Sequence, residues 1–366
     1  MIVFTYIRTE ISVLRQNRDN IDPVPALHTV SAFRLESIVL IIQKVKTYCK
    51  NYIVRLFMSE GYIGLIGLGA IGAPLAEMLY KKYDERFVLV SDDKHSGWLK
   101  SGRIRINGTP FTPKVLCPAD YNGEKLDVLF ICVKNYSLVG TFDEIRNMIR
   151  DDTLLMPLQN GLYSYDFLRS RFPENIVLEG FAQGPNTRIY GNDIVYQNPG
   201  TYCLGKNHVA YKEYASDLYD MLQAAGVPCI LKDDIRHAIW CKLMLNVAGN
   251  ALTALTDLDY VMFKHSPDAQ KVARTIMQEF KFVAATEDVL ITEADIANVM
   301  EYFTTYSESK RTSMLEDVIN KRPTENEYIA GYIKRLAIKH GVSAPFIDML
   351  YSIMRIKEDV YLGKLS

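Results

Sequence analysis

One short stretch of this 366-residue chain constrains its fold more than any other, because an apolar strand pattern runs directly into an amphipathic helix pattern. The stretch is YIGLIGLGAIGAPLAEMLY, residues 62–80, and its three glycines have the spacing G-x-G-x-x-G. The first glycine permits a tight turn, the second lets a ligand approach the backbone, and the third lets the helix pack closely on the strand. Free N–H groups at the start of the helix then favour a pyrophosphate, so we expect a dinucleotide against this loop. The loop consists of Gly67, Leu68, Gly69, Ala70, Ile71 and Gly72.

A second part of the same signature follows the helix. The apolar residues of RFVLVS (86–91) predict another strand, and Asp92 comes directly after it, 20 residues beyond Gly72. An acid at this position accepts hydrogen bonds from the ribose hydroxyls of the adenosine. A carboxylate there repels the additional phosphate of NADP and favours NAD(H). Lys94 would instead support NADP(H) if the turn directs it inward, so the sequence leaves the preference between NAD and NADP open.

The rest of the chain shows two successive patterns of predicted secondary structure. As far as residue 232, apolar strands alternate with helical segments, and the bulky run at 127–133 predicts a parallel strand buried on both faces. Beyond it strand patterns disappear, and helices are expected over 233–255, 267–289, 294–306, 314–320, 326–340 and 345–361. The sequence therefore predicts an α/β fold class. An N-terminal Rossmann-type, doubly wound parallel sheet (58–232) is followed by an all-α C-terminal domain (233–366).

Residues 1–57 differ in composition from the remainder. They contain no glycine, although the chain has 21, and they carry eight Lys and Arg residues against four acids. Their net charge of +4 contrasts with −5 for the rest, and Met58 stands just ahead of the first predicted strand. We interpret 1–57 as a leader outside the predicted fold. A start assigned too early is the simpler explanation, and a regulatory or targeting arm is the alternative.

Composition excludes several classes of partner. The net charge of −1 gives no electrostatic reason to expect nucleic acid or an anionic membrane. No uninterrupted apolar run approaches the ~18 residues of a membrane span. The six cysteines contain no C-x-x-C pair and are typical of reduced thiols in a cytoplasmic protein. The six histidines show no close ligand spacing such as H-E-x-x-H, so no metal site is predicted.

Within DIRHAIWCKLMLNVAGNALTAL, three polar residues recur at helical spacing. Lys242, Asn246 and Asn250 follow one another at i, i+4 and i+8 and would line one face of a helix. Burying a cation and two amides without partners costs ~1–3 kcal/mol or more each, so something must satisfy them. A bound ligand would do so, and so would water if the face is a solvated stripe on a surface helix.

From about Met58 to its end, the chain resembles the ketopantoate reductase (2-dehydropantoate 2-reductase) family. The matching segments occur in family order: GLGAIG, CVKNY, LQNG, the K-x-x-x-N-x-x-x-N helix, TSMLEDV…KRPTENEYIAGYI and GVSAPF. The resemblance implies an NAD(P)-dependent oxidoreductase that reduces 2-dehydropantoate to pantoate in pantothenate and coenzyme A biosynthesis. Family members usually use NADP(H) and place an arginine after the second strand. Here Ser91, Asp92 and Asp93 stand at that place, which puts the usual cofactor preference in doubt.

The resemblance also implies roles for single residues. Lys242 would be the general acid at the 2-oxo oxygen, and Glu325 would hold substrate and lysine in place. The residues that would contact the substrate are Asn246, Asn250 and Ser313, and those beside the cofactor are Lys134 and Asn160. Some have a plain structural alternative: Glu325 could open a helix, Ser313 could be a packing residue, and Lys134 could be a solvated strand end. Asp317 also falls on a family-like acidic position, although a role on a helix surface is equally compatible.

Two alternatives to this function remain open on sequence grounds. A relative with the same chemistry could act on another 2-oxo or 3-oxo acid. The protein could instead be a dinucleotide-binding sensor or scaffold, which belongs to a different functional class because it has no catalytic activity. Such a protein has no need of Lys242, Asn246, Asn250 and Glu325 together. The expected partner is a small-molecule 2-oxo acid, without nucleic acid or membrane, and the sequence is compatible with a homodimer.

Overall fold

The computed structural model describes residues 61–205, 211–305 and 309–365. Nearly all of them belong to one compact unit, Tyr62–Ser366. The leader predicted at 1–57, together with Met58, lies outside the described residues.

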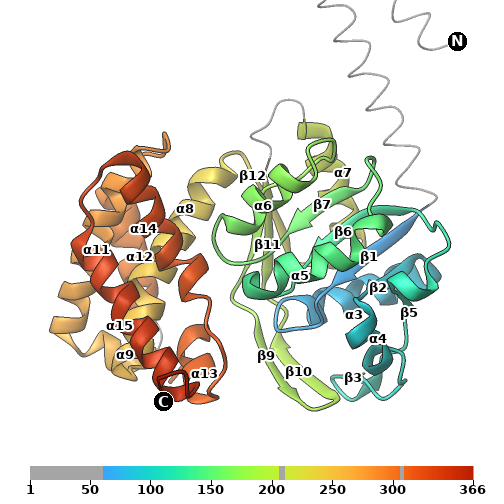
Figure 1. The fold of residues 1–366 in the computed structure, drawn as a ribbon, viewed down its shortest axis with the longest axis horizontal. Coiled ribbons are helices and arrows are strands. Elements are labelled where there is room, and N and C mark those ends of the chain that lie inside the picture. The colour runs from blue at the N-terminus through green and yellow to red at the C-terminus, as the bar shows by residue number, and fades with distance from the viewer. Residues whose placement is uncertain (1–60, 206–210, 306–308, 366) are drawn as a thin grey trace, which may run out of the picture. The chain divides into compact units, whose positions relative to one another are not determined.

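A five-stranded parallel sheet lies at the centre of the N-terminal half (Figure 1). Its strand order is β5–β2–β1–β6–β7, and every neighbouring pair is parallel. The strands are β1 (Tyr62–Ile66), β2 (Phe87–Val90), β5 (Lys114–Leu116), β6 (Leu126–Ile131) and β7 (Leu154–Pro157). Strands β1 and β6 are adjacent in the sheet although other strands separate them in sequence. They form the switch point beyond whose carboxyl ends doubly wound folds bind ligands.

Helices pack against this sheet and bury it. They are α3 (Gly72–Tyr83), α4 (Asp93–Leu99), α5 (Asn135–Ile145) and α6 (Tyr163–Arg171). All residues of β2 and β6 are buried, as expected for parallel strands covered on both faces. Strand residues such as Val88 and Leu129 share a core cluster with Phe142 of α5 and Leu168 of α6. The predicted fold class is confirmed.

Two smaller sheets and one further helix complete the N-terminal half. One sheet has the order β4–β3–β10–β9 and the other β12–β11–β8. Their strands are β3 (Arg105–Ile106), β4 (Thr109–Pro110), β8 (Gly180–Gln183), β9 (Asn186–Tyr190), β10 (Asp193–Asn198), β11 (Thr201–Gly205) and β12 (Cys229–Lys232). The helix is α7 (Lys212–Ala224). The N-P-G sequence between β10 and β11 forms a turn, with Gly200 at φ +80° and its N–H donating to Asn198 Oδ1 at 2.9 Å.

The described residues after β12 are helical, as the sequence predicts. The helices are α8 (Ile235–Leu245), α9 (Ala251–Thr256), α10 (Tyr260–Lys264), α11 (Pro267–Ala285), α12 (Glu293–Thr305), α13 (Ser313–Ile319), α14 (Ala330–His340) and α15 (Pro345–Tyr361). Trp240, Phe280 and Phe303 are fully buried in their common core. Thr292 and Asp295 form a helix-start motif at α12. The Asp295 N–H donates to Thr292 Oγ1 at 3.2 Å, and the Thr292 N–H donates to Asp295 Oδ2 at 2.8 Å.

The helix expected over 233–255 differs from the prediction in its middle. A π-helical turn, Asn246–Asn250, separates α8 from α9. The combined helix Ile235–Thr256 is long and apolar enough to cross a membrane by length and composition, and it is the one such helix in the part of the chain that the structure describes. Because 72% of its most apolar window is buried inside the protein, it fits a core helix of the domain.

Candidate active site

The glycine loop after β1 has the geometry of a phosphate-binding turn. Gly67 has φ +98°, and a Cβ atom there would lie 2.5 Å from the backbone nitrogen of Val133. A Cβ at Gly72 would lie 2.0 Å from the Gly67 carbonyl oxygen, so neither position accepts a side chain. A Cβ at Gly69, in contrast, would meet no described atom within 4 Å. Helix α3 then begins without a side-chain cap. An open glycine beside an uncapped helix start fits the pyrophosphate of a dinucleotide.

Asp92 lies at the carboxyl end of β2, as predicted, and its side chain also makes hydrogen bonds within the protein. It is the N-cap of α4, and its Oδ1 accepts from the His95 N–H at 2.8 Å and lies 2.7 Å from the His95 ring Nδ1. The sequence alone did not reveal this cap. A carboxylate has about four acceptor positions, so the contacts with His95 leave capacity for ribose hydroxyls.

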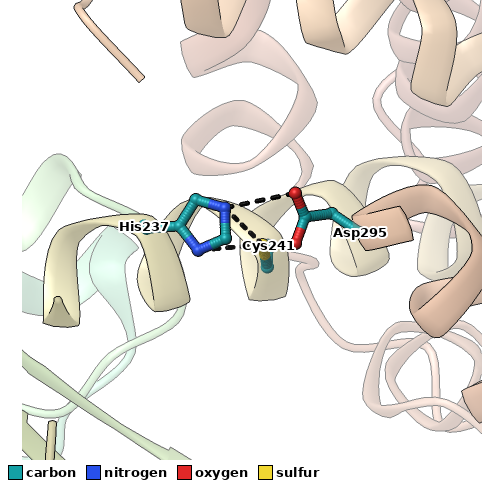
Figure 2. A group of neighbouring side chains, drawn as sticks. All are labelled: His237, Cys241 and Asp295. Carbon is teal, nitrogen blue, oxygen red and sulfur yellow. Dashed lines mark hydrogen bonds and ion pairs between the residues drawn. The ribbon is translucent and has the colours of Figure 1, made fainter. Parts of the chain in front are cut away.

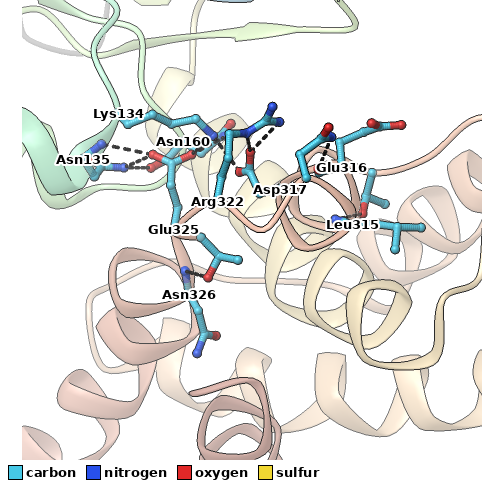
Figure 3. Close-up of polar contacts among 12 residues, drawn as sticks. Lys134, Asn135, Asn160, Leu315, Glu316, Asp317, Arg322, Glu325 and Asn326 are labelled. Carbon is cyan, nitrogen blue, oxygen red and sulfur yellow. Dashed lines mark hydrogen bonds and ion pairs between the residues drawn. The ribbon is translucent and has the colours of Figure 1, made fainter. Parts of the chain in front are cut away.

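The buried carboxylate of Glu325 contacts residues that follow the carboxyl ends of strands β6 and β7 (Figure 3). Glu325 precedes a short 3₁₀ turn, and its side chain accepts four hydrogen bonds. Its Oε1 accepts from the backbone N–H of Asn135 at 3.1 Å and from Asn135 Nδ2 at 3.0 Å. Its Oε2 accepts from Lys134 Nζ at 3.3 Å and from Asn160 Nδ2 at 3.4 Å. Lys134 follows β6 and Asn160 follows β7, so Glu325 reaches the carboxyl ends of both strands. Sequence reasoning missed Asn135, although it stands next to Lys134 in CVKNY.

Lys242 approaches the same carboxylate through one intermediate residue. Its Nζ donates to Asn160 Oδ1 at 2.9 Å and to the Ala182 carbonyl oxygen, and it lies 5.1 Å from the centre of the Phe181 ring. Asn160 therefore contacts Lys242 with its oxygen and Glu325 with its nitrogen. Burial lowers the pKa of Lys242 to about 8, an effect that the interactions with Cys203 and Glu325 oppose.

The pKa of Lys134, the other lysine of the site, is shifted in the opposite direction. Burial lowers the pKa of Lys134, but the Glu325 and Asp317 carboxylates outweigh it, and the pKa is raised above its usual value. Lys134 Nζ lies 3.1 Å from Asp317 Oδ2, and Arg322 Nε donates to the other Asp317 oxygen at 2.9 Å. The pKa of Lys134 is thus raised, whereas that of Lys242 is lowered to about 8. Two like groups with separated pKa values are a mark of acid–base chemistry.

The two asparagines of the predicted helix face lie in the π-helical turn and are buried. Asn250 Nδ2 donates to Asn246 Oδ1 at 3.0 Å. The Nδ2 of Asn246 is buried and finds no acceptor among the described residues. A buried amide without a partner costs ~1–3 kcal/mol, which an oxygen of a bound ligand would recover. π-helical turns inside α-helices occur frequently at functional sites.

Ser313 does not join this network within the described residues. It is exposed at the first position of α13. Its neighbour Thr312 is the buried residue there: it caps α13 and bonds Thr253 across a distance of 2.9 Å. The site therefore brings together Lys134, Asn160, Lys242 and Glu325 and leaves Ser313 apart.

Comparisons with known proteins add to this geometry. The family model described as "Ketopantoate reductase PanE/ApbA" matches residues 63–208, and the model "Ketopantoate reductase PanE/ApbA C terminal" matches residues 234–358. A 2-dehydropantoate 2-reductase of Lactococcus lactis subsp. lactis is 25% identical over 320 residues, 82% of this chain and 99% of the relative.

Solved structures are similar over the same range. D-mandelate dehydrogenase in complex with NADH and anilino(oxo)acetate has a TM-score of 0.74 at 25% identity, covering 82% of this chain and 99% of that one. The 2-dehydropantoate 2-reductase from Methylococcus capsulatus has a TM-score of 0.71 at 27% identity, covering 82% and 97%. Both solved structures are thus matched over nearly their whole length.

Proposed function

Because this chain belongs to the ketopantoate reductase family and is thereby an NAD(P)-dependent oxidoreductase, we propose that it reduces 2-dehydropantoate to pantoate, a step toward pantothenate and coenzyme A. In this reaction a hydride reaches carbon 2 of the substrate and a proton reaches its oxygen, so that the carbonyl becomes a secondary alcohol. The observation that carries the proposal is the ammonium of Lys242, held by Asn160 and the Ala182 carbonyl at the edge of a dinucleotide-binding sheet.

Lys242 acts as the general acid. An ammonium has three donor positions, and Asn160 and Ala182 use two of them. The third remains for the 2-oxo oxygen of the substrate. Negative charge develops on that oxygen as the hydride arrives, so the lysine stabilises the transition state more than the ground state. A positioned proton donor contributes ~10²–10⁴-fold to the rate.

Glu325 acts through Asn160 as a positioning residue. Its two oxygens already accept four hydrogen bonds, which matches the acceptor capacity of a carboxylate. Asn160 is thereby fixed with its nitrogen toward Glu325 and its oxygen toward Lys242. The carboxylate sets the orientation of the amide, and the amide sets the position of the lysine.

Substrate contacts are assigned to the helix that carries Lys242. Asn246 has a buried Nδ2 ready to donate to a carboxylate or hydroxyl oxygen of the 2-oxo acid, and Asn250 holds that amide by its oxygen. Ser313 is retained as a further substrate contact on the family resemblance alone. It would have to act from the exposed start of α13.

The cofactor supplies the hydride when it is bound. The loop Gly67–Leu68–Gly69–Ala70–Ile71–Gly72 would hold its pyrophosphate, with Gly69 providing the open backbone face. Lys134 and Asn160, at the ends of β6 and β7, would stand beside it. Asp92 would bind the adenosine ribose and favour NADH over NADPH.

A substrate panel tests the proposed function. The purified protein is mixed with NADH or NADPH and with 2-dehydropantoate, pyruvate, 2-oxoisovalerate or phenylglyoxylate, and nucleotide absorbance is followed. The highest kcat/KM is expected for 2-dehydropantoate. A complete lack of nucleotide oxidation with every acid would contradict the proposed enzyme.

A second candidate substrate class rests on one specific similarity. The solved D-mandelate dehydrogenase resembles this chain as closely as the reductases do, and its structure contains NADH and anilino(oxo)acetate, a compound with an aryl group. The same residues here would then reduce a bulkier 2-oxo acid, and phenylglyoxylate would be the best substrate of the panel. A non-catalytic sensor is the less favoured alternative, because it has no need of Lys242 and its network.

Three other features belong to the proposal. The domain boundary is placed at residue 232, where β12 ends, and 1–57 is a leader. A cytoplasmic location accords with the free thiols of the described cysteines. A homodimer is supported by an apolar row on α15 that is 45–63% exposed and spaced three and four residues apart. The row consists of Phe346, Met349, Ile353, Ile356 and Val360.

A further inference from the structure

Three metal-ligating side chains converge outside the network of Lys242 and Glu325 (Figure 2). His237 and Cys241 lie one turn apart on α8, and Asp295 faces them from the first turn of α12. Each can offer one ligand atom, and these atoms all lie within 4.8 Å of one another. The H-x-x-x-C spacing was not recognised from the sequence, where only C-x-x-C pairs and close histidine spacings such as H-E-x-x-H were considered.

We propose that His237, Cys241 and Asp295 bind a divalent transition-metal ion of the zinc type. The ring Nε2 of His237 lies 3.3 Å from Asp295 Oδ2 and 3.7 Å from Cys241 Sγ. Metal–ligand bonds of ~2.0 Å to nitrogen and oxygen and ~2.3 Å to sulfur, at tetrahedral angles, place ligand atoms ~3.3 Å (N to O) and ~3.6 Å (N to S) apart. These two separations are therefore already nearly those that the ion requires, and the ligand atoms of Cys241 and Asp295 lie within 4.8 Å of each other.

The donor set selects the kind of ion. One imidazole nitrogen, one thiolate and one carboxylate suit zinc or cobalt and disfavour magnesium and calcium, which prefer oxygen ligands only. Three protein ligands leave a fourth tetrahedral position for water. All three residues are half-buried, so solvent reaches the site.

Hydrogen bonds from Thr292 orient the Asp295 carboxylate even without a bound ion. Asp295 Oδ2 accepts from the N–H of Thr292 at 2.8 Å and from its hydroxyl at 2.6 Å. Such outer contacts orient ligands in metal sites. Zinc and cobalt bind the thiolate form of cysteine, so the ion would take the place of the thiol proton of Cys241.

The consequence of binding would be structural. An ion would tie α12 to α8 next to Lys242, because Cys241 immediately precedes that residue. A plain ion pair between His237 and Asp295 would also link the two helices, but it would have no use for the thiol and no response to a metal.

The test uses the full chain purified without a histidine tag and stripped with a chelator. Cobalt(II) chloride is titrated in while thiolate-to-cobalt charge-transfer absorption is recorded, and zinc chloride is titrated in while the thermal midpoint is recorded. We expect the absorption to saturate at one ion per chain. We expect the midpoint to rise by about 5 °C at a zinc concentration of 100 times Kd.

Matched variants locate the ion. Cys241→Ser and His237→Gln should each abolish the absorption and the rise in midpoint. His340→Gln removes another histidine–carboxylate pair, 2.8 Å from Glu287, and should retain both responses. Cys229→Ser should retain both as well. A wild-type protein without charge-transfer absorption would overturn the proposal, and so would an absorption that persists in both the Cys241 and the His237 variants.

Discussion

Lys242 gives the most specific expectation at the scale of single residues. With a pKa lowered to about 8 by burial, it is charged below that pH and neutral above it. A general acid must be protonated, so kcat/KM for reduction should be constant below about pH 8 and fall tenfold per pH unit above it. A profile of kcat/KM between pH 6 and 10 reports this group in the free enzyme. A constant value up to pH 10 would contradict the assignment.

Asn160→Asp tests whether that descending limb belongs to Lys242. The added carboxylate would lie 2.9 Å from the ammonium and should raise its pKa, moving the limb to higher pH. A substitution that merely loosened the fold would lower the rate without moving the limb. The thermal midpoint of the variant provides the control for folding.

Asp92 supports a separate expectation about the cofactor. Asp92→Asn removes the charge but keeps the helix cap, because asparagine caps as well as aspartate does. The ratio of kcat/KM for NADH to that for NADPH should fall by ~10-fold, with little change in thermal midpoint. An unchanged ratio would mean that the carboxylate does not contact the ribose side of the cofactor.

At the scale of elements, sequence patterns located the buried parts well. Strands β2 and β6 are continuous apolar runs buried over their whole length, which is the signal that predicts them. Strands β3 and β4 have two residues each, and β9 is mostly exposed. None of them therefore produces a recognisable alternation of apolar and polar residues in the sequence. The short helices α4, α6 and α10 were missed as well.

The π-helical turn marks another limit of sequence patterns. Its five residues are buried like those of the adjoining helices, so hydrophobic spacing does not distinguish its hydrogen-bond register from that of an α-helix. The glycine within it has a packing reason that only the structure reveals. A Cβ at Gly249 would lie 1.9 Å from Cζ of the buried Phe303.

Gly249→Ala should therefore destabilise the fold despite the better helix propensity of alanine. Overpacking of this kind costs ~1–3 kcal/mol in the free energy of unfolding, which denaturant titration measures. Gly140→Ala in α5 is the matched control. Its Cβ would meet no described atom within 4 Å, so it should add ~0.5–1 kcal/mol of stability. Equal effects of the two substitutions would show that the contact with Phe303 does not limit this position.

At the scale of the whole molecule, the site depends on pairings that no local pattern contains. Lys134 meets Asp317 across 183 positions, and Asn135 meets Glu325 across 190. The family resemblance pointed to Lys134, Asn160, Lys242 and Glu325 as separate residues. It did not reveal that Asn160 links the last two, because hydrogen-bond partners follow from how the two halves pack.

The exposed row on α15 leads to an expectation about assembly. Ile353→Glu and Ile356→Glu introduce charge into the middle of the row, where these side chains are 45% and 58% exposed. If two copies pair through it, sedimentation equilibrium should show a dimer for the wild type and a monomer for each variant. Phe282→Glu, 62% exposed on α11, is the control and should leave the dimer intact. A wild-type monomer at micromolar concentration would refute the pairing.

Turnover by the Lys242→Met variant tests whether Lys242 is the acid of a hydride-transfer enzyme. The variant keeps the length of the side chain and loses the charge. We predict that kcat falls by ~10²-fold or more, while the dissociation constant of NADH or NADPH, followed by nucleotide fluorescence, changes little. Lys281→Met, which removes a lysine paired with Glu293 on the surface, should keep full turnover. Near-normal kcat in the Lys242→Met protein would contradict the mechanism.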